Sequence, residues 1–242
     1  VLEEVMAVAK GKLTIIAHVA CNNTKDSVEL ARHAEELGVD AIAAIPPIYF
    51  RLPEYSVAHY WNEISAAAPN TDFVIYNIPQ LAGVALTPSL YKEMLKNQRV
   101  IGVKNSSMPV QDIQTFASLG GEDHIVFNGP DEQFLGGRLM GAGAGIGGTY
   151  GAMPELFLKL NQLIADKELE TARALQFAIN GIIGVLTSAH GNMYGVIKEV
   201  LRINEGLELG SVRSPLTPVT EGDQEVVQKA ASLISEVKER FL

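Results

Sequence analysis

The sequence predicts an α/β fold in which a parallel β-sheet is followed by a helical region. Short apolar, β-branched runs alternate with amphipathic stretches of helical periodicity through the first 152 residues. Because these runs are almost continuously apolar, we expect strands that are covered on both faces, as in a parallel sheet with helical crossovers. From about Met153 onward the periodicity is helical alone, which predicts a small helical bundle.

Each predicted strand precedes a predicted helix. The strands are expected in six runs, at residues 13–19, 40–45, 73–77, 100–104, 124–129 and 142–149. Helices are expected to begin near Thr24, Pro53, Thr87, Pro109 and Asp131. Six parallel strands fit two architectures, an open doubly wound sheet or a (β/α)₈ TIM barrel that lacks its first two β/α units.

The first residues predict a helix rather than a strand. Leu2, Val5 and Met6 share one helical face, and no capping residue precedes Val1. An intact doubly wound domain should begin with a strand, so this start favours the barrel lacking two units. We expect a partial barrel over residues 1–152 and a C-terminal helical region, including the last barrel helix, over residues 153–242. Its helices are predicted near residues 153–165, 168–186, 191–203 and 222–240.

Composition excludes several classes of function. The 242 residues are 47% hydrophobic, enough for a sizeable core, and the net charge of −9 makes nucleic acid and anionic membrane surfaces poor partners. The single Cys21 cannot build a disulfide framework, and the five histidines lack zinc-like spacing. No apolar run approaches the roughly 20 residues that span a bilayer. We therefore expect a cytoplasmic protein without a metal ion or membrane segment.

Candidate catalytic residues lie at the carboxyl ends of the predicted strands, which is where active sites and ligand-binding sites lie in both architectures. Lys104 closes one strand, and a lysine amine there can attack a carbonyl, although it also fits a solvated residue at a strand end. Tyr76 on the neighbouring strand is a candidate for proton transfer or an aromatic cap of the rim. Asp131 and Glu132 suit either sugar hydroxyls or helix capping, and capping is favoured for Asp131.

The glycine-rich segment 141–148 contains a formal G-x-G-x-x-G pattern at Gly143, Gly145 and Gly148. A dinucleotide fingerprint should follow a strand and open a helix, whereas here the apolar strand is embedded within the glycines. Close backbone packing at a strand is the favoured interpretation. No organic cofactor is expected.

Four motifs at the strand ends together resemble the dihydrodipicolinate synthase/N-acetylneuraminate lyase family. They are YNIP at 76–79, GVK at 102–104, NGPDE at 128–132 and GIGGTY at 145–150. The resemblance implies a (β/α)₈ barrel with a C-terminal helical extension, assembled as a homotetramer. It places Lys104 on the family's Schiff-base lysine and Tyr76 on its proton-relay tyrosine. Tyr49 resembles a tyrosine that some members lend to the site of a neighbouring subunit.

The resemblance also indicates the substrate. Leu81 stands where the synthase branch carries an arginine for a substrate carboxylate, which favours the lyase branch. Residues that resemble the sugar-binding positions of lyases are Ser106, Gly129, Asp131, Glu132 and Gly148. Lyases usually carry serine at the position of Gly148, so one substrate contact differs. The family's G-[ST]-T-G-E loop, which binds the keto acid's carboxylate in the second β/α unit, is not among these residues.

The expected activity is that of a class I pyruvate aldolase which needs no cofactor. The resemblance implies cleavage of sialic acid (N-acetylneuraminate) to N-acetylmannosamine and pyruvate through an imine on Lys104. Two alternatives stay open from the sequence. One is a 4-hydroxy-tetrahydrodipicolinate synthase-type or other 2-keto sugar acid aldolase, and the other is a non-catalytic paralogue that senses sugar acids.

Overall fold

The computed structural model describes residues 1–242, and the chain divides into two compact units. The first unit contains Val1–Pro130 and Met140–Gly145, and the second contains Asp131–Leu139 and Ile146–Leu242. Each unit has a hydrophobic core of its own. The division into a barrel domain of residues 1–152 and a helical domain of residues 153–242 stays a prediction.

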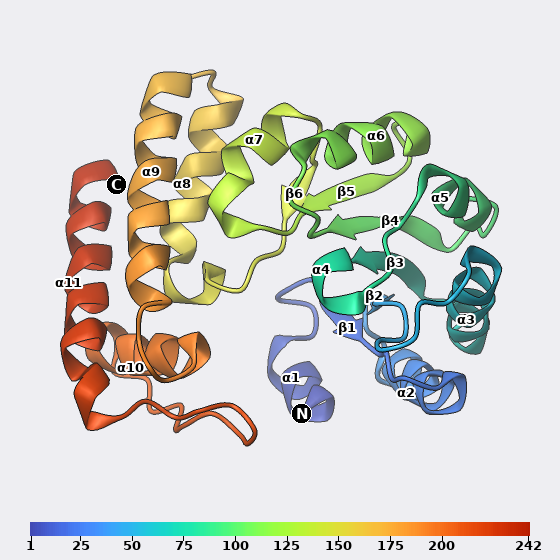
Figure 1. The fold of residues 1–242 in the computed structure, drawn as a ribbon, viewed down its shortest axis with the longest axis horizontal. Helices are drawn as coiled ribbons and strands as arrows, with labels where there is room; N and C mark the ends of the chain where they lie inside the picture. Colours follow the sequence, from blue (N-terminus) through green and yellow to red (C-terminus); the bar gives the residue numbers. More distant parts are fainter. The chain divides into compact units, whose positions relative to one another are not determined.

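A six-stranded parallel sheet forms the centre of the first unit (Figure 1). Its strands are β1 (Ile16–His18), β2 (Ala41–Ala44), β3 (Asp72–Asn77), β4 (Val100–Asn105), β5 (Ile125–Asn128) and β6 (Ala144–Gly145). Every strand pairs with its successor in the chain, so the order is β1-β2-β3-β4-β5-β6 without a reversal. A doubly wound sheet reverses its strand order at a switch point. The sheet is therefore a half-barrel, and the doubly wound alternative is wrong.

The two faces of the sheet carry different side chains because successive residues of a strand point to opposite sides. On β3, Phe73 and Ile75 are buried in the core that the sheet shares with the helices. Val74 faces the other way and packs with Ala41 and Ala43 of β2. The second face is thus the inner face of the half-barrel, and along β2 its side chains are small.

Helices of the first unit cover the outer face of the sheet (Figure 1). They are α1 (Leu2–Ala9), α2 (Thr24–Leu37), α3 (Glu54–Ala67), α5 (Pro88–Met94) and α6 (Val110–Gly120), whereas the short α4 (Pro79–Ala82) lies beyond the carboxyl end of β3, where Gln80 donates to the Ser106 carbonyl. The predicted helix starts are confirmed by local chemistry. The Asn23 side chain caps α2 by accepting from the Asp26 N–H at 2.9 Å, and Thr87 caps α5 in front of a proline. The sequence analysis did not predict the short helix α4.

The second unit is helical. Its elements are η1 (Asp131–Gln133), α7 (Phe134–Leu139), η2 (Tyr150–Ala152), α8 (Pro154–Ala165), α9 (Leu169–Leu186), α10 (Met193–Glu205), η3 (Glu221–Asp223) and α11 (Gln224–Phe241). Helix α9 packs against both α8 and α11, which lie beside it in Figure 1. Its buried stripe, Leu175, Ile179, Ile182 and Leu186, has the spacing of one helical face. The four long helices begin within two residues of the predicted positions.

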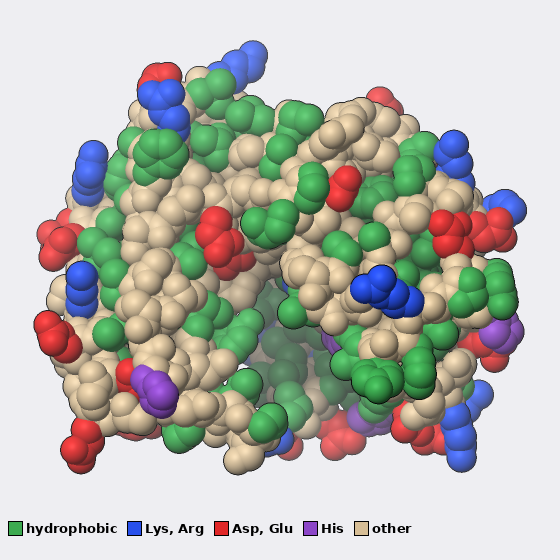
Figure 2. Space-filling view, viewed as in Figure 1, with side chains coloured by type: hydrophobic (Ala, Val, Ile, Leu, Met, Phe, Trp, Pro, Cys, Tyr) green, Lys and Arg blue, Asp and Glu red, His purple; other side chains and the backbone are tan.

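Charged side chains on the surface are of mixed sign. Figure 2 shows acidic and basic side chains interspersed over the visible face, without a large field of one sign. No helix in the chain is both long and apolar enough to span a membrane.

Candidate active site

Lys104 and Tyr76 lie side by side at the carboxyl ends of β4 and β3. The two residues are partners in the parallel register of these strands. The Nζ atom of Lys104 is 3.9 Å from the centroid of the Tyr76 ring, and both side chains are partly buried. A cation at this distance over an aromatic face is attracted by the ring quadrupole. The structure thus brings the predicted nucleophile and the predicted proton-relay residue into direct contact.

The GVK motif has a steric basis. A Cβ atom at Gly102 would lie 1.9 Å from the carbonyl oxygen of Ile125 on β5, so no side chain fits there. Val103 points to the outer face and is fully buried in the core. Lys104 then returns to the face of Gly102, the inner face of the half-barrel. A glycine and a buried valine therefore allow the strand to end with its lysine facing inward.

A buried polar network holds the ends of β3 and β4 together. The Asn77 amide donates to the Asn105 Oδ1 atom at 2.7 Å and accepts from the Leu86 N–H at 2.9 Å. Asn105 donates to the Ser107 hydroxyl, which donates to Asp112 at 2.6 Å. Asn77 and Asn105 directly follow Tyr76 and Lys104 in the sequence. A satisfied buried network of this kind rigidifies its surroundings, so it fixes the strand ends that carry the two candidate catalytic groups.

Ser106 and Gly129 lie close to each other beyond the ends of β4 and β5. The Ser106 N–H donates to the Asn77 carbonyl at 2.7 Å, and the Gly129 N–H donates to the Asn105 carbonyl at 2.8 Å. A Cβ atom at Gly129 would come within 2.0 Å of the Ser106 hydroxyl oxygen, so the close approach requires glycine. Two of the predicted substrate-binding residues are therefore neighbours, and Ser106 follows Asn105 of the strand that carries Lys104.

His18 was missed by the sequence analysis. Its ring lies 5.9 Å from the Tyr76 ring in an edge-to-face arrangement, and its Nε2 atom accepts a hydrogen bond from the Ile45 N–H at 3.3 Å. Water reaches the side chain, but enough protein surrounds it that desolvation lowers the pKa of His18, and the charge of Lys104 lowers it further. The signal in the sequence was its position near the end of the first predicted strand, comparable to that of Lys104 at the end of the fourth.

In the second unit, the carboxylate of Asp131 holds a turn of the chain. Its Oδ2 atom accepts hydrogen bonds from the Thr149 N–H at 2.8 Å and from the Thr149 hydroxyl at 2.5 Å. A Cβ atom at Gly147 would meet the Asp131 Oδ1 atom at 1.7 Å, so the GIGGTY segment packs closely against this carboxylate. Glu132 is exposed, and its carbonyl oxygen accepts from Asn180 at 3.0 Å. Of the two carboxylates, Glu132 has the more accessible side chain.

Gly148 faces the hydroxyl group of Tyr194. A Cβ atom at Gly148 would lie 2.8 Å from the Tyr194 Oη atom, and Tyr194 is 48% exposed. A side chain at position 148 would therefore require the phenol to move. The sequence analysis singled out Gly148 but not Tyr194, because the two residues lie 46 positions apart and on different elements.

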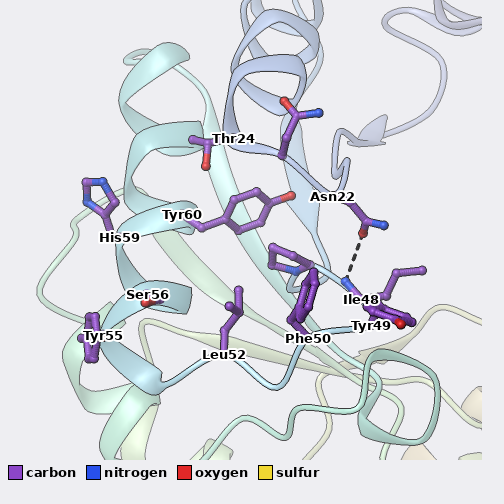
Figure 3. A pocket seen from close by; sticks show the side chains of 12 residues that line it. Asn22, Thr24, Ile48, Tyr49, Phe50, Leu52, Tyr55, Ser56, His59 and Tyr60 are labelled. Carbon is purple, nitrogen blue, oxygen red and sulfur yellow. Dashed lines mark hydrogen bonds between the residues drawn. The ribbon is translucent and has the colours of Figure 1, made fainter.

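Tyr49 lies on the loop between β2 and α3, beside a cavity of about 530 Å³ (Figure 3). Its φ of 84° is unusual for a residue other than glycine, and its side chain is 88% exposed. The Tyr49 ring packs edge-to-face on Phe50, at 4.9 Å between centroids, and the Asn22 side chain accepts from the Ile48 N–H at 3.1 Å. No ring contact joins Tyr49 to Tyr76, so these two predicted residues are not brought together within the unit.

No cluster of three or more histidine, cysteine, aspartate or glutamate side chains is arranged to hold a metal ion. The polar groups gathered at the ends of β1, β3 and β4 are an amine, a phenol and an imidazole. An amine beside groups that transfer protons can form an imine with a carbonyl compound.

The family model described as the dihydrodipicolinate synthetase family matches residues 1–234. The chain belongs to this family. The match includes all six strands and the helices up to most of α11, so the dihydrodipicolinate synthetase family accounts for both compact units.

Within the family, the chain is similar to enzymes that act on sialic acids. It is 68% identical over 242 residues to the N-acetylneuraminate lyase of Mediterraneibacter gnavus, covering the whole chain and 77% of that relative. It matches the wild-type Ruminococcus gnavus sialic acid aldolase with a TM-score of 0.98 at 68% identity, covering the whole chain and 80% of that structure. A structure of that aldolase's catalytic lysine mutant matches with the same TM-score and identity, with 79% of it covered.

Proposed function

We propose that this protein is a Schiff-base-forming carbon–carbon lyase that cleaves N-acetylneuraminate to N-acetylmannosamine and pyruvate. The observation that carries the proposal is the Lys104 amine 3.9 Å above the Tyr76 ring at adjacent strand ends. The 68% identity to an N-acetylneuraminate lyase over the whole chain supports this substrate. The catalytic lysine of the similar aldolase supports the chemistry.

The Lys104 amine, once deprotonated, attacks the C2 carbonyl carbon of the open-chain sugar acid. Loss of water gives an iminium ion, which withdraws electrons from the adjacent C3–C4 bond. Tyr76 relays the proton of the C4 hydroxyl group as this bond breaks, because the phenol receives this proton while its own passes to the carboxylate of the substrate. The electron pair of the C3–C4 bond then moves to form a pyruvate enamine on Lys104, and the C4 atom leaves as the aldehyde carbon of N-acetylmannosamine.

The enamine is then protonated at C3, and water hydrolyses the resulting iminium ion to release pyruvate and the free amine. The proton for C3 comes back through the group that took part in proton transfer during cleavage, and the Tyr76 phenol beside the amine suits this role. The Lys104–Tyr76 contact therefore supports both halves of the cycle.

We propose five residues for the binding of sugar hydroxyls, on the basis of the family resemblance. Ser106 and Gly129 belong to the first unit and lie in close approach to each other. Asp131, Glu132 and Gly148 belong to the second unit. The exposed Glu132 supports a direct role in binding, whereas the hydrogen bonds of Asp131 to Thr149 support a role in shaping the GIGGTY turn.

We also propose that the half-barrel is part of a (β/α)₈ barrel whose first two β/α units lie outside these residues, with the helical unit as its C-terminal extension. The sequential strand order supports this architecture. A homotetramer in which Tyr49 reaches a neighbouring subunit is supported by the exposed rings of Tyr49, Phe50 and Tyr55. A single cysteine fits a cytoplasmic location.

Reductive trapping tests the proposed function. Incubation with pyruvate and borohydride is expected to add one irreversible pyruvate-derived mass at Lys104, measured by mass spectrometry of peptides. Lys104→Ala is expected to abolish both labelling and release of pyruvate from N-acetylneuraminate. Lys92→Ala, on the exposed side of α5, is the matched control and should keep both. Labelling at another lysine, or turnover by Lys104→Ala, contradicts the proposal.

A further inference from the structure

The inner face of the half-barrel carries small side chains along β2. The side chains that β2 presents to this face include Ala41 and Ala43, with one methyl group each, and Ala43 is the register partner of both His18 on β1 and Val74 on β3. Neighbouring strands lie about 4.8 Å apart, so β1 and β3 are separated by about 10 Å across β2. A large side chain on β1 can therefore reach over the alanines and contact a side chain on β3.

His18 makes this contact. It ends β1, on the inner face with Ile16 two positions before it, and its ring meets the Tyr76 ring at 86° with 5.9 Å between the centroids. Edge-to-face aromatic pairs at this separation are favourable beyond the area that they bury. The contact bridges the strand that separates the two residues in the sheet.

The other side of the imidazole is fixed by the backbone. The Ile45 N–H, just beyond β2, donates to the His18 Nε2 atom at 3.3 Å. An imidazole that accepts at Nε2 carries its proton on Nδ1 and is neutral. Desolvation and the nearby Lys104 charge both lower the pKa of His18, which favours the same neutral form. The ring is thus held in one orientation by a hydrogen bond on one side and by an aromatic contact on the other.

Tyr76 consequently has a neighbour on two sides. The Lys104 amine lies over the face of its ring, and the His18 ring stands perpendicular to it. The position of the Tyr76 hydroxyl depends on the orientation of this ring. Without the His18 ring, the methyl group of its register partner Ala43 would leave space into which the Tyr76 ring can turn away from the amine.

We propose that His18 is a positioning residue for the Schiff-base reaction, because its ring holds the Tyr76 phenol in line with the Lys104 amine. This inference rests on the proposed function. His18 acts through Tyr76, and a misplacement of a reacting group by about 1 Å costs up to a hundredfold in rate.

Three substitutions in the full chain distinguish the role of the His18 ring from the role of its hydrogen bond with the Ile45 N–H. His18→Ala removes both the ring and the acceptor. His18→Phe keeps a planar ring beside Tyr76 but cannot accept from the Ile45 N–H, which water can reach. His18→Gln offers an acceptor in place of Nε2 but no ring. His33→Ala is the matched control, because His33 lies on the outer helix α2 and pairs with Glu3 at 3.0 Å.

The measurements are kcat and KM for N-acetylneuraminate, the single-turnover rate of pyruvate trapping at Lys104, and thermal unfolding. For His18→Ala we expect kcat to fall about ten- to hundredfold with KM changed less than threefold. His18→Phe is expected to restore kcat to within about threefold of the unsubstituted protein. His18→Gln is expected to remain as slow as His18→Ala, and His33→Ala to be unchanged. Thermal unfolding identifies any variant whose loss of activity follows from a loss of folded protein.

A kcat for His18→Ala within twofold of the unsubstituted protein overturns the inference. Rescue by His18→Gln but not by His18→Phe also overturns it, because the hydrogen bond rather than the ring would then matter. The inference is also overturned if neither His18→Phe nor His18→Gln has a higher kcat than His18→Ala. If the unsubstituted protein is not trapped by pyruvate at all, the proposed function fails instead, and the two failures are therefore distinguishable.

Discussion

The amine of Lys104 lies 3.9 Å above the ring of Tyr76 because the two residues are register partners on β4 and β3. The partnership continues one residue further, where Asn77 and Asn105 are joined by a buried hydrogen bond of 2.7 Å. The strands therefore place the proposed reactive pair and the hydrogen bond that supports it at consecutive register positions. A substitution in the Lys104–Tyr76 pair is therefore expected to change catalysis, and one in the Asn77–Asn105 pair to change the stability of the strand ends.

Tyr76→Phe tests the hydroxyl group alone. The phenylalanine ring still lies under the Lys104 amine, so folding and imine formation with pyruvate are expected to persist. Cleavage is expected to slow by about 10²–10⁴-fold, the usual contribution of a positioned proton-transfer group. Stopped-time assays of pyruvate release measure the slow step, and borohydride trapping reports the imine. A variant that cleaves N-acetylneuraminate at the original rate contradicts the assigned role of the phenol.

Gly102→Ala tests the steric basis of the GVK motif. The added Cβ atom would lie 1.9 Å from the Ile125 carbonyl oxygen, a rigid backbone group, so β4 and β5 must separate. Overpacking of this kind typically costs about 1–3 kcal/mol in the free energy of unfolding. Urea unfolding measures this loss. Gly151→Ala is the control, because nothing lies within 4 Å of its added Cβ atom. Equal stabilities of the two variants would show that the close approach at Gly102 is unimportant.

The two adjacent carboxylates of the second unit are expected to respond differently to amidation. Asp131→Asn weakens the acceptor for the Thr149 N–H and hydroxyl, so we expect a lower melting temperature. Glu132→Gln leaves the fold unchanged and is expected to raise KM for N-acetylneuraminate about tenfold. Differential scanning calorimetry and steady-state kinetics separate the two effects. A destabilised Glu132→Gln, or an Asp131→Asn altered only in KM, reverses these assignments.

Asp223 links stability to pH. The Thr220 N–H, followed by the His190 N–H, lowers the pKa of this carboxyl group from 3.8 to about 2. Because the folded state binds the proton less tightly than the unfolded state, the stabilisation is complete above pH 3.8 and is lost as the pH falls toward 2. Asp223→Asn is expected to lower the melting temperature at pH 7. The difference in melting temperature between this variant and the unsubstituted protein is expected to shrink as the pH falls from 4 to 2. If the difference in melting temperature stays constant from pH 4 to pH 2, protonation of Asp223 is not linked to the stability of the fold.

The sequence could predict those features that depend on local periodicity. Lys104 and Tyr76 were singled out as candidates because each lies at the end of an apolar run, and helix starts were expected near Thr24 and Thr87, where α2 and α5 begin. Six parallel strands left two architectures open. The order of the strands decided between them, and strand order depends on contacts between distant residues.

Contacts across strands or between distant segments escaped prediction for a physical reason. His18 is a candidate site residue because its ring meets that of Tyr76 across β2, where its register partner is the small Ala43, and no local pattern predicts this contact. The hydrogen bonds from Thr149 to Asp131 join residues 18 positions apart, and no local pattern marks them. Helix α4 is only four residues long, which is too short to show helical periodicity.

Ala41 and Ala43 each present only a methyl group on the inner face of the half-barrel. At Ala43, the register partner of His18, this small size lets the His18 imidazole and the Tyr76 phenol meet across β2. A branched residue at position 43 would force these rings apart while leaving every strand pairing intact. The size of the side chain at position 43 therefore sets whether His18 and Tyr76 can touch, although Ala43 carries no functional group of its own.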